Sequence, residues 1–445
     1  MHILKGYTKQ EISWMMYDWA NSAHSVIIVT LLPIFFDTVA GYTADSVSSM
    51  STWGFATSLA MASIAMLIVA LAAPFLGVFG DIRGMRKKLF SFFMLLGVAA
   101  CAGMAFTPGM DFTSGPVAAG KVASLILVLY IVSVIGFDAS AIYYDAFLTD
   151  VTIEDRMDKV STMGYGLGYI GGSTIPLLIF LIMNLVGVPM LTCLAFVFGL
   201  TAVWWLAFSL PLLKNCEQTS GKPYEKGDVA RSIKGVGTTI KEIIANKPML
   251  IYILSYFFYI DGVHTVISMA TTYGTNLGLD STGLLLALLV TQFVAFPFSI
   301  LFGRLAEKYD TGKLILTCIA AYTGITVFAV FMKAQWQFWV LAIFVGMFQG
   351  GIQALSRSYF AKIVPPERSG EYFGLMDICG KGASFMGTTV VGLASQAFGS
   401  INIGISAIVF LFLAGALFFM KTEHSGLESM KNQENVIMGQ QMFHD

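Results

Sequence analysis

Charged residues are scarce in this chain. Of its 445 residues only 12% are Asp, Glu, Lys or Arg, whereas 56% are hydrophobic, and the mean hydropathy is +0.74. A soluble domain is roughly 25% charged and about 45–50% apolar. So little charge cannot cover a soluble surface, and the composition therefore predicts an all-α polytopic membrane protein. The net charge of −1 produces no field that would favour nucleic acid.

Cysteine and histidine are also rare, with five of each. No C-x-x-C pair occurs, and four of the cysteines fall in apolar segments, so we expect buried thiols rather than disulfides or metal ligands. The chain has no H-E-x-x-H, no G-x-S-x-G and no histidines at metal-ligand spacing. The sequence therefore predicts no metal, no cofactor and no enzymatic activity.

Long apolar runs are abundant, and about 20 residues suffice to cross a bilayer. The expected spans are 12–38, 51–79, 88–107, 121–146, 159–184, 190–213, 248–276, 281–306, 313–332, 336–362, 369–397 and 402–421. The polar segment between the sixth and seventh spans should contain an amphipathic helix over 229–245. The expected domains are two six-helix halves, 1–213 and 248–421, a cytoplasmic linker, 214–247, and a cytoplasmic tail, 422–445.

Basic residues gather in alternate loops, such as "GDIRGMRKK", "EDRMDK", "GRLAEKYDTGK" and "KIVPPERSG". The opposite loops have almost none; Lys121 and Lys333 are exceptions at expected helix edges. Because cytoplasmic loops carry an excess of Lys and Arg, this pattern predicts that both termini and the linker are cytoplasmic.

Polar residues recur at helical spacing inside four of the expected spans. They are Asp18, Asn21, Ser22 and Ser25; Asp138 and Asp145; Asp261, His264, Thr265 and Ser268; and Asp377, Lys381, Ser384 and Thr388. A polar stripe is costly in lipid, so each one should line a cavity or meet another helix. Ionisable residues inside a membrane are candidates for a substrate or proton pathway.

Asp377 and Lys381 lie one helical turn apart. Lys381 can reach back to Asp377, or either residue can face an acid in the first or seventh span. A lysine without a fixed partner would attract a substrate carboxylate or phosphate, and a desolvated acid that loses its partner would take up a proton. Exchange of these partners is one route to coupled transport, and a fixed structural salt bridge is the alternative.

Asp261 and His264 suit a proton relay, since histidine titrates near neutral pH. The alternative for His264 is a hydrogen-bonded residue between helices. Asp18 and Asn21 occupy the equivalent place in the first span and either belong to the pathway or anchor that helix structurally.

Three more charges lie inside the expected spans. Asp138 lies deeper than Asp145 and is the better candidate for coupling, whereas Asp145 is near a helix end and could be an interfacial charge. Arg357, near the end of the tenth span, is expected to act in gating or to pair with an acid. His24 points away from the Asp18 stripe, which predicts a packing role.

The loop after the second span reads "GVFGDIRGMRKK", and a weaker copy, "GRLAEKYDTGK", follows the eighth span. Repeats at equivalent places in two halves are typical of secondary transporters. The first copy resembles the major facilitator loop pattern G-x-x-x-D-R-x-G-R-R. The residues that carry this likeness and a predicted gating role are Gly77, Asp81, Arg83, Gly84 and Arg86. Arg83 stands one place later than the pattern requires, and Met85 replaces an arginine.

Three further motifs resemble the vacuole-effluxer-like branch of that superfamily. They are "YDWANSAHSVII" (17–28), "GYGLGYIGG" (164–172) and "GGIQALSRSYFAKIVPPERSGEYFGLMDICGK" (350–381). The branch includes a fungal vacuolar amino-acid effluxer linked to autophagy, so the resemblance implies a carrier and suggests amino-acid export. The short loops favour a bacterial inner-membrane protein. The glycines of the second motif recur every four residues, which predicts close packing of the fifth span.

The leading hypothesis is a secondary active transporter that moves a small polar solute by alternating access, coupled to protons. Its expected partners are the solute, a proton and the lipid bilayer. A lipid or lysolipid flippase of the same fold is the first alternative. A membrane-embedded enzyme is the alternative from another class, and the missing catalytic motifs speak against it.

Overall fold

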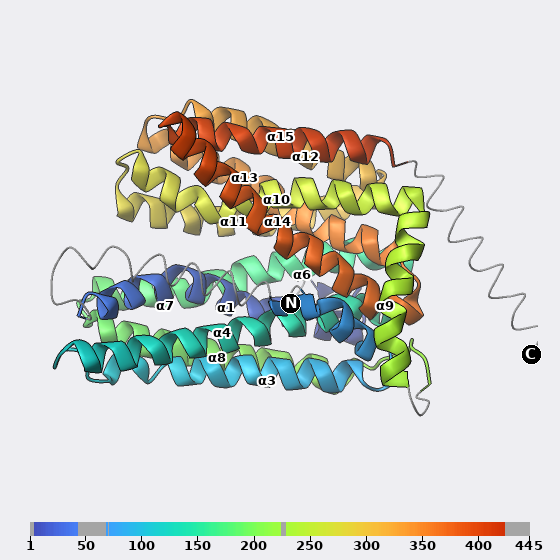
Figure 1. The fold of residues 1–445 in the computed structure, drawn as a ribbon, viewed down its shortest axis with the longest axis horizontal. Coiled ribbons are helices and arrows are strands. Elements are labelled where there is room, and N and C mark those ends of the chain that lie inside the picture. Colours follow the sequence, from blue (N-terminus) through green and yellow to red (C-terminus); the bar gives the residue numbers. More distant parts are fainter. Residues whose placement is uncertain (1–3, 43–67, 70, 224–227, 423–445) are drawn as a thin grey trace, which may run out of the picture. The chain divides into compact units, whose positions relative to one another are not determined.

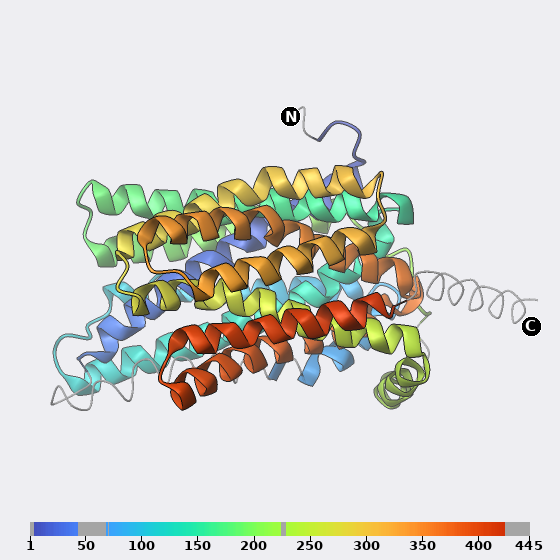
Figure 2. The same cartoon turned by 90° about the horizontal axis from the view of Figure 1, so that it is seen from above.

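The computed structural model describes residues 4–42, 68–69, 71–223 and 228–422. Helices dominate this part of the chain (Figures 1 and 2). The first group is α1 (Lys9–Ala40), α3 (Arg86–Met104), α4 (Pro116–Ala146), α5 (Leu148–Val151), α6 (Met157–Leu167), a π-helical turn (Gly168–Ser173), α7 (Thr174–Leu185) and α8 (Met190–Asn215). The second group is α9 (Asp228–Ala245), α10 (Lys247–Asn276), α11 (Ser281–Ala306), α12 (Thr311–Val330), α13 (Gln335–Ile363), α14 (Ser369–Phe398) and α15 (Ile401–Met420).

Nine helical segments of the described residues are long and apolar enough to cross a membrane. In addition, α1 and α14 have 32 and 30 residues, which exceeds the length that a bilayer requires. The span expected over 51–79 lies mostly outside the described residues, and its described end, Leu71–Gly80, is helical. The amphipathic helix expected over 229–245 is observed as α9.

Two of the expected spans differ from the structure by more than a shift of one to three residues at their ends. Helix α4 begins at Pro116 rather than at 121, because proline at the first helical position is compatible with a helix start. Lys121 is consequently inside the helix and not at its edge. The fifth span is not one continuous α-helix, because the π-helical turn Gly168–Ser173 interrupts it.

The chain forms two compact units. The first comprises Met1–Ala72, Gly84–Tyr144 and Leu167–Glu217, and the second comprises Ala73–Arg83, Asp145–Gly166 and Gln218–Asp445. The second unit thus contains short segments of the first six spans together with all of the last six. The domain boundaries drawn from the sequence remain a prediction.

Aromatic side chains pack against one another between the helices of the first unit. Trp14 of α1 stacks on Tyr144 of α4 at 4.5 Å between ring centroids, and its indole N–H donates to the Tyr144 carbonyl at 2.8 Å. His24 is buried and stacks on Phe137, with its Nε2 3.3 Å from the Ser133 hydroxyl. This environment agrees with a packing role for His24.

In the second unit, α10 packs against α14 and α15, and α11 packs against α13. Tyr252 and Tyr259 of α10 are fully buried. The Tyr252 hydroxyl donates to the Ser356 carbonyl at 3.1 Å, and the Tyr259 hydroxyl lies 2.7 Å from the Ser356 hydroxyl. Figure 1 shows α9 at a steep angle to α10, passing the ends of α10 and α14.

Candidate functional site

Asp81 binds the start of α14. Its buried carboxylate accepts the backbone N–H of Gly370 at 2.7 Å and that of Glu371 at 2.9 Å. The first N–H groups of a helix have no partner within the helix, and the positive end of its dipole favours a negative charge. The acid of the repeated loop motif therefore caps a 30-residue helix that is distant in sequence.

The structure explains why glycine occupies two positions of the same motif. A Cβ on Gly77 would overlap the backbone of Gly370, so only glycine allows helix Leu71–Gly80 to approach α14 this closely. Gly84 has a φ of +80°, a conformation that other residues rarely adopt.

Two arginines complete the predicted gating loop. Arg83 donates through its backbone N–H to the Lys222 carbonyl at 2.9 Å and through its guanidinium to the Gly221 carbonyl at 3.4 Å. The start of the linker thus holds this loop. Arg86, at the beginning of α3, is completely buried. The predicted role of both residues in gating remains a prediction.

Arg357 of α13 joins two segments of the first six spans. Its Nη1 lies 3.2 Å from Asp145 Oδ1, and its Nε and Nη2 donate to the hydroxyl and carbonyl of Ser161 at 2.9 and 3.1 Å. The guanidinium also lies 4.4 Å from the centroid of the Tyr165 ring. Asp145, which the sequence left as a possible interfacial charge, is therefore part of an ion pair.

Asp158 of α6 is the centre of a second cluster. It is buried, and it accepts hydrogen bonds from Ser358 at 2.5 Å and from Thr311 at 2.7 Å. The Lys362 ammonium lies 2.5 Å from the Oδ2 atom of Asp158. One carboxylate thus connects α6 with α12 and α13. The nearby pair of Lys159 and Glu307 is largely exposed and should contribute little to stability.

The linker helix α9 also reaches the start of α14. The Thr239 hydroxyl donates to Glu371 at 2.5 Å, and Arg368 binds both Glu242, at 2.8 Å, and Glu371, at 3.2 Å. Burial alone would lower the pKa of Arg368, but the hydrogen bond to Glu242 and the charge of Glu371 raise it above its ordinary value. The guanidinium is therefore a permanent charge that ties α9 to the loop before α14.

Asp261 of α10 is fully buried and faces α14. Its Oδ1 accepts the backbone N–H of Gly387 at 2.9 Å and the Thr265 hydroxyl at 3.3 Å. A Cβ on Gly387 would overlap both side chains, so α14 approaches this polar stripe closely. Its Oδ2 has no hydrogen-bond partner among the residues that the structure describes.

Other polar residues of α10 and α14 are predicted to belong to the same pathway. The His264 ring hydrogen-bonds the backbone of Gly380 in α14. Asp377 is half-buried. The backbone of α14 passes through Lys381, but the side chain of Lys381 lies outside the described residues. Its predicted pairing with Asp377 remains a prediction.

The polar stripe of the first span meets the fifth span. Asp18 and Asn21 are buried, and Ser22 donates to the Asp18 carbonyl at 2.7 Å. A Cβ on Gly168 would lie 2.5 Å from the Ser22 hydroxyl, so part of this stripe faces the π-helical turn. Asp138 of α4 is also buried.

The sequence missed the Asp158 cluster and the ties of α9. The sequence pattern assigns Lys362 and Arg368 only to the positive charges that set topology, and it assigns no role to Asp158. A usable signal was present, because the start of the fifth span and the end of the tenth span should reach the same membrane surface and carry opposite charges there.

The fold is that of a known transporter class. A solved structure of XylE, a proton:xylose symporter of the major facilitator superfamily, matches with a TM-score of 0.71 and 15% identity over 95% of this chain and 98% of that one. The chain therefore has the all-α, 12-span major facilitator fold in two six-helix halves, and the predicted fold class is confirmed.

Sequence comparison assigns the chain to a narrower group of proteins than the fold does. The family described as "Vacuole effluxer Atg22 like" matches residues 7–429, and the chain belongs to it. An uncharacterized MFS-type transporter of Bacillus subtilis, YxiO, is 40% identical over 97% of this chain and 99% of its own length. Autophagy-related protein 22-2 of Aspergillus clavatus is 25% identical over 61% of this chain and 48% of its own length. The chain is thus an MFS-type transporter and not an enzyme.

Proposed function

We propose that this transporter moves a small polar solute by alternating access and couples the movement to protons. The buried carboxylate of Asp261 carries the proposal. An ionisable group inside a membrane is costly and usually functional. One oxygen of Asp261 is bound to α14, and the other has no hydrogen-bond partner among the described residues, which leaves a position for a proton.

We propose further that the clusters around Arg357 and Asp158 form a gate. Both connect segments of the first six spans with helices of the last six, so a movement of one half against the other would have to break them. Charge-assisted hydrogen bonds contribute about 1.5–3 kcal/mol each, so a few of them can hold one conformation without locking it. We include Asp81 and its contacts with α14 in the same gate.

Amino acids are the proposed solutes, and export is the proposed direction. The membership in the vacuole-effluxer family supports a carrier that releases solutes, and the stripe around Asp261 and His264 suits a polar solute. The 40% identical bacterial relative supports a bacterial inner membrane as the location, and the distribution of basic residues supports cytoplasmic termini.

Transport by the purified protein tests the proposal. Proteoliposomes with an imposed pH gradient would be supplied with a pool of amino acids and small metabolites, and the solutes retained would be identified by mass spectrometry. We expect at least one polar solute to accumulate only when the gradient is present. Accumulation that ignores the gradient would contradict proton coupling, and movement of fluorescent lysolipid in place of any polar solute would favour the flippase alternative.

A further inference from the structure

Helix α9 has more apolar surface than the protein covers. Val236 and Ile243 are buried, and the intervening Thr239 binds Glu371. Ile240 and Ile244, however, remain 41% and 57% exposed. They are four residues apart and therefore lie one above the other on the same side of the helix. Two large aliphatic side chains on one side of an otherwise anchored helix indicate an apolar environment outside the protein.

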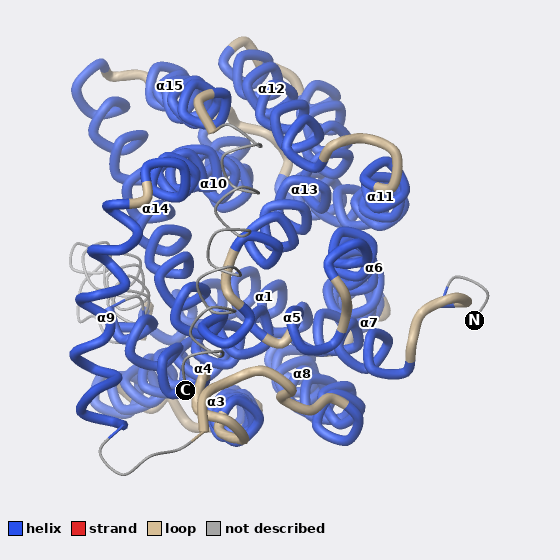
Figure 3. The backbone as a smooth tube through the Cα atoms, turned by 90° about the vertical axis from the view of Figure 1, so that its right-hand side faces the viewer, coloured by secondary structure: helices blue, strands red, loops and turns tan. Residues whose placement is uncertain are grey.

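The position of α9 indicates what that environment is. Figure 3 shows α9 beside α14, and Figure 1 shows it passing the ends of α10 and α14. Only Asn246 separates α9 from α10, which is a membrane span that begins at Lys247. Helix α9 therefore ends where a membrane span begins, and it runs across the direction of that span. This position is at the level of the bilayer surface.

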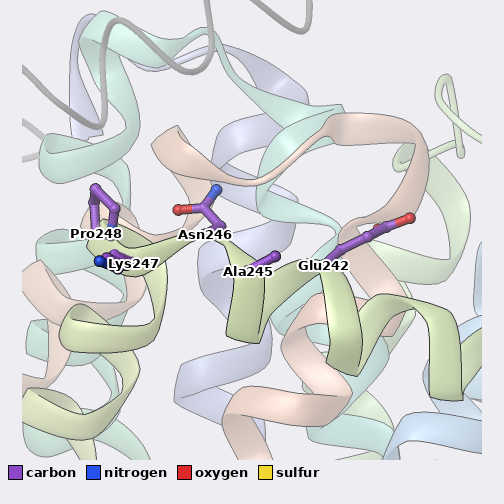
Figure 4. A pocket seen from close by; sticks show the side chains of 5 residues that line it. All are labelled: Glu242, Ala245, Asn246, Lys247 and Pro248. Atoms are coloured by element: carbon purple, nitrogen blue, oxygen red, sulfur yellow. The ribbon is translucent and has the colours of Figure 1, made fainter.

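The charges beside the isoleucines are positive. Lys241 and Lys247 are exposed, and no ion pair to either occurs among the described residues. The acid between them, Glu242, is already bound by Arg368 at 2.8 Å. An open depression lies at the corner between α9 and α10 (Figure 4) and is lined by Glu242, Ala245, Asn246, Lys247 and Pro248.

We propose that α9 is an interfacial helix that binds the bilayer surface where α10 enters the membrane. Ile240 and Ile244 insert at the boundary between headgroups and acyl chains. Lys241 and Lys247 contact anionic lipid headgroups, as basic residues beside an apolar helix face commonly do. Because the same helix binds Arg368 and Glu371 on its other side, the lipid surface is connected directly to the start of α14.

Spin labels on the full-length protein in nanodiscs test this surface. Nitroxides would be attached to I240C, I244C and the control T238C, an exposed position about 200° away from Ile240 around the helix. Unsubstituted protein measures the background from the five native cysteines, of which four are buried and Cys379 is half-buried. Collision rates with oxygen, which concentrates in lipid, are compared with those of a water-soluble nickel chelate.

We expect labels at 240 and 244 to favour oxygen and the label at 238 to favour nickel. Adding phosphatidylglycerol to phosphatidylcholine nanodiscs should increase the oxygen preference at 240 and 244, and K241Q/K247Q should remove that increase. Equal nickel access at all three positions would overturn the proposal. Exclusion of both reagents at 240 and 244 would also overturn it, because a protein surface, such as a second copy of this chain, would then cover the helix. An unchanged lipid response in K241Q/K247Q would refute the role of the two lysines.

Discussion

At the scale of single residues, Asp158 shows how one carboxylate can hold three helices. Two hydroxyl donors and the Lys362 ammonium surround it, and it is buried. Taking such a charge out of water is expensive, and only a complete set of partners compensates for it. Removing one partner should therefore cost more than removing the pair.

Asp158→Asn should lower the thermal stability of the detergent-purified protein, because it leaves the Lys362 charge in a partly buried site. Loss of one partner of a buried pair costs about 3–5 kcal/mol, and the partial exposure of Lys362 reduces this figure. The double variant D158N/K362Q should regain part of the loss. Unfolding temperatures of the wild type, both single variants and the double variant measure the coupling. Strictly additive effects would show that the pair contributes nothing.

Asp81 gives a second prediction at this scale. Asp81→Asn keeps one oxygen acceptor for the first N–H groups of α14 but loses the negative charge, and Asp81→Ala loses both. Loss of a helix cap costs about 0.5–2 kcal/mol. We expect unfolding temperatures in the order wild type, D81N, D81A. An equal loss in both variants would assign the effect to charge alone.

At the scale of elements, the π-helical turn Gly168–Ser173 fits the fifth span to α1. The Thr174 hydroxyl donates to the Tyr169 carbonyl at 2.7 Å and so satisfies a backbone group within the turn. The Trp204 indole donates at 3.0 Å to the Trp19 carbonyl, which lies against Gly172. Such turns occur frequently at functional sites, and this one lies beside the polar stripe of α1.

Gly172→Ala should destabilise the protein, because the new Cβ would lie 2.5 Å from the Trp19 carbonyl oxygen and 2.9 Å from the Ala23 backbone nitrogen. Overpacking of this kind costs about 1–3 kcal/mol. Gly199→Ala in α8 is the matched control, since its Cβ would meet only Ala105 at an ordinary 3.6 Å. Alanine there should be neutral or stabilise by about 0.5–1 kcal/mol. Equal unfolding temperatures for the two variants would contradict this account of helix packing.

At the scale of the whole molecule, the sequence predicted the fold because the length of each apolar run identifies a membrane span. Helix α11 was expected over 281–306 and has these bounds. The interruption of the fifth span could not be predicted, since the π-helical turn depends on contacts with α1. The amphipathic pattern of the linker was sufficient to predict α9 but not its attachment to Arg368.

The candidate site was predicted only in part. Helical spacing brought Asp261 and His264 to one stripe, but it could not show that Gly387 of α14 would approach it. The sequence predicted that Arg357 could pair with an acid. It could not predict that this acid is Asp145, because the two residues are 212 positions apart and meet only in the tertiary structure. Ion pairs between charges near span ends were the hardest to predict. The positive-inside rule already accounts for such charges, so the sequence gives no reason to look for a partner.

Proton coupling through Asp261 is the central claim, and accumulation of the transported solute in proteoliposomes tests it most directly. Asp261→Asn keeps an oxygen acceptor for the Gly387 N–H, so the fold should remain, but an amide cannot take up the proton. We predict that the wild type concentrates the solute under a pH gradient, whereas the variant exchanges solute across the membrane without concentrating it. Accumulation by D261N at the level of the wild type would contradict the account.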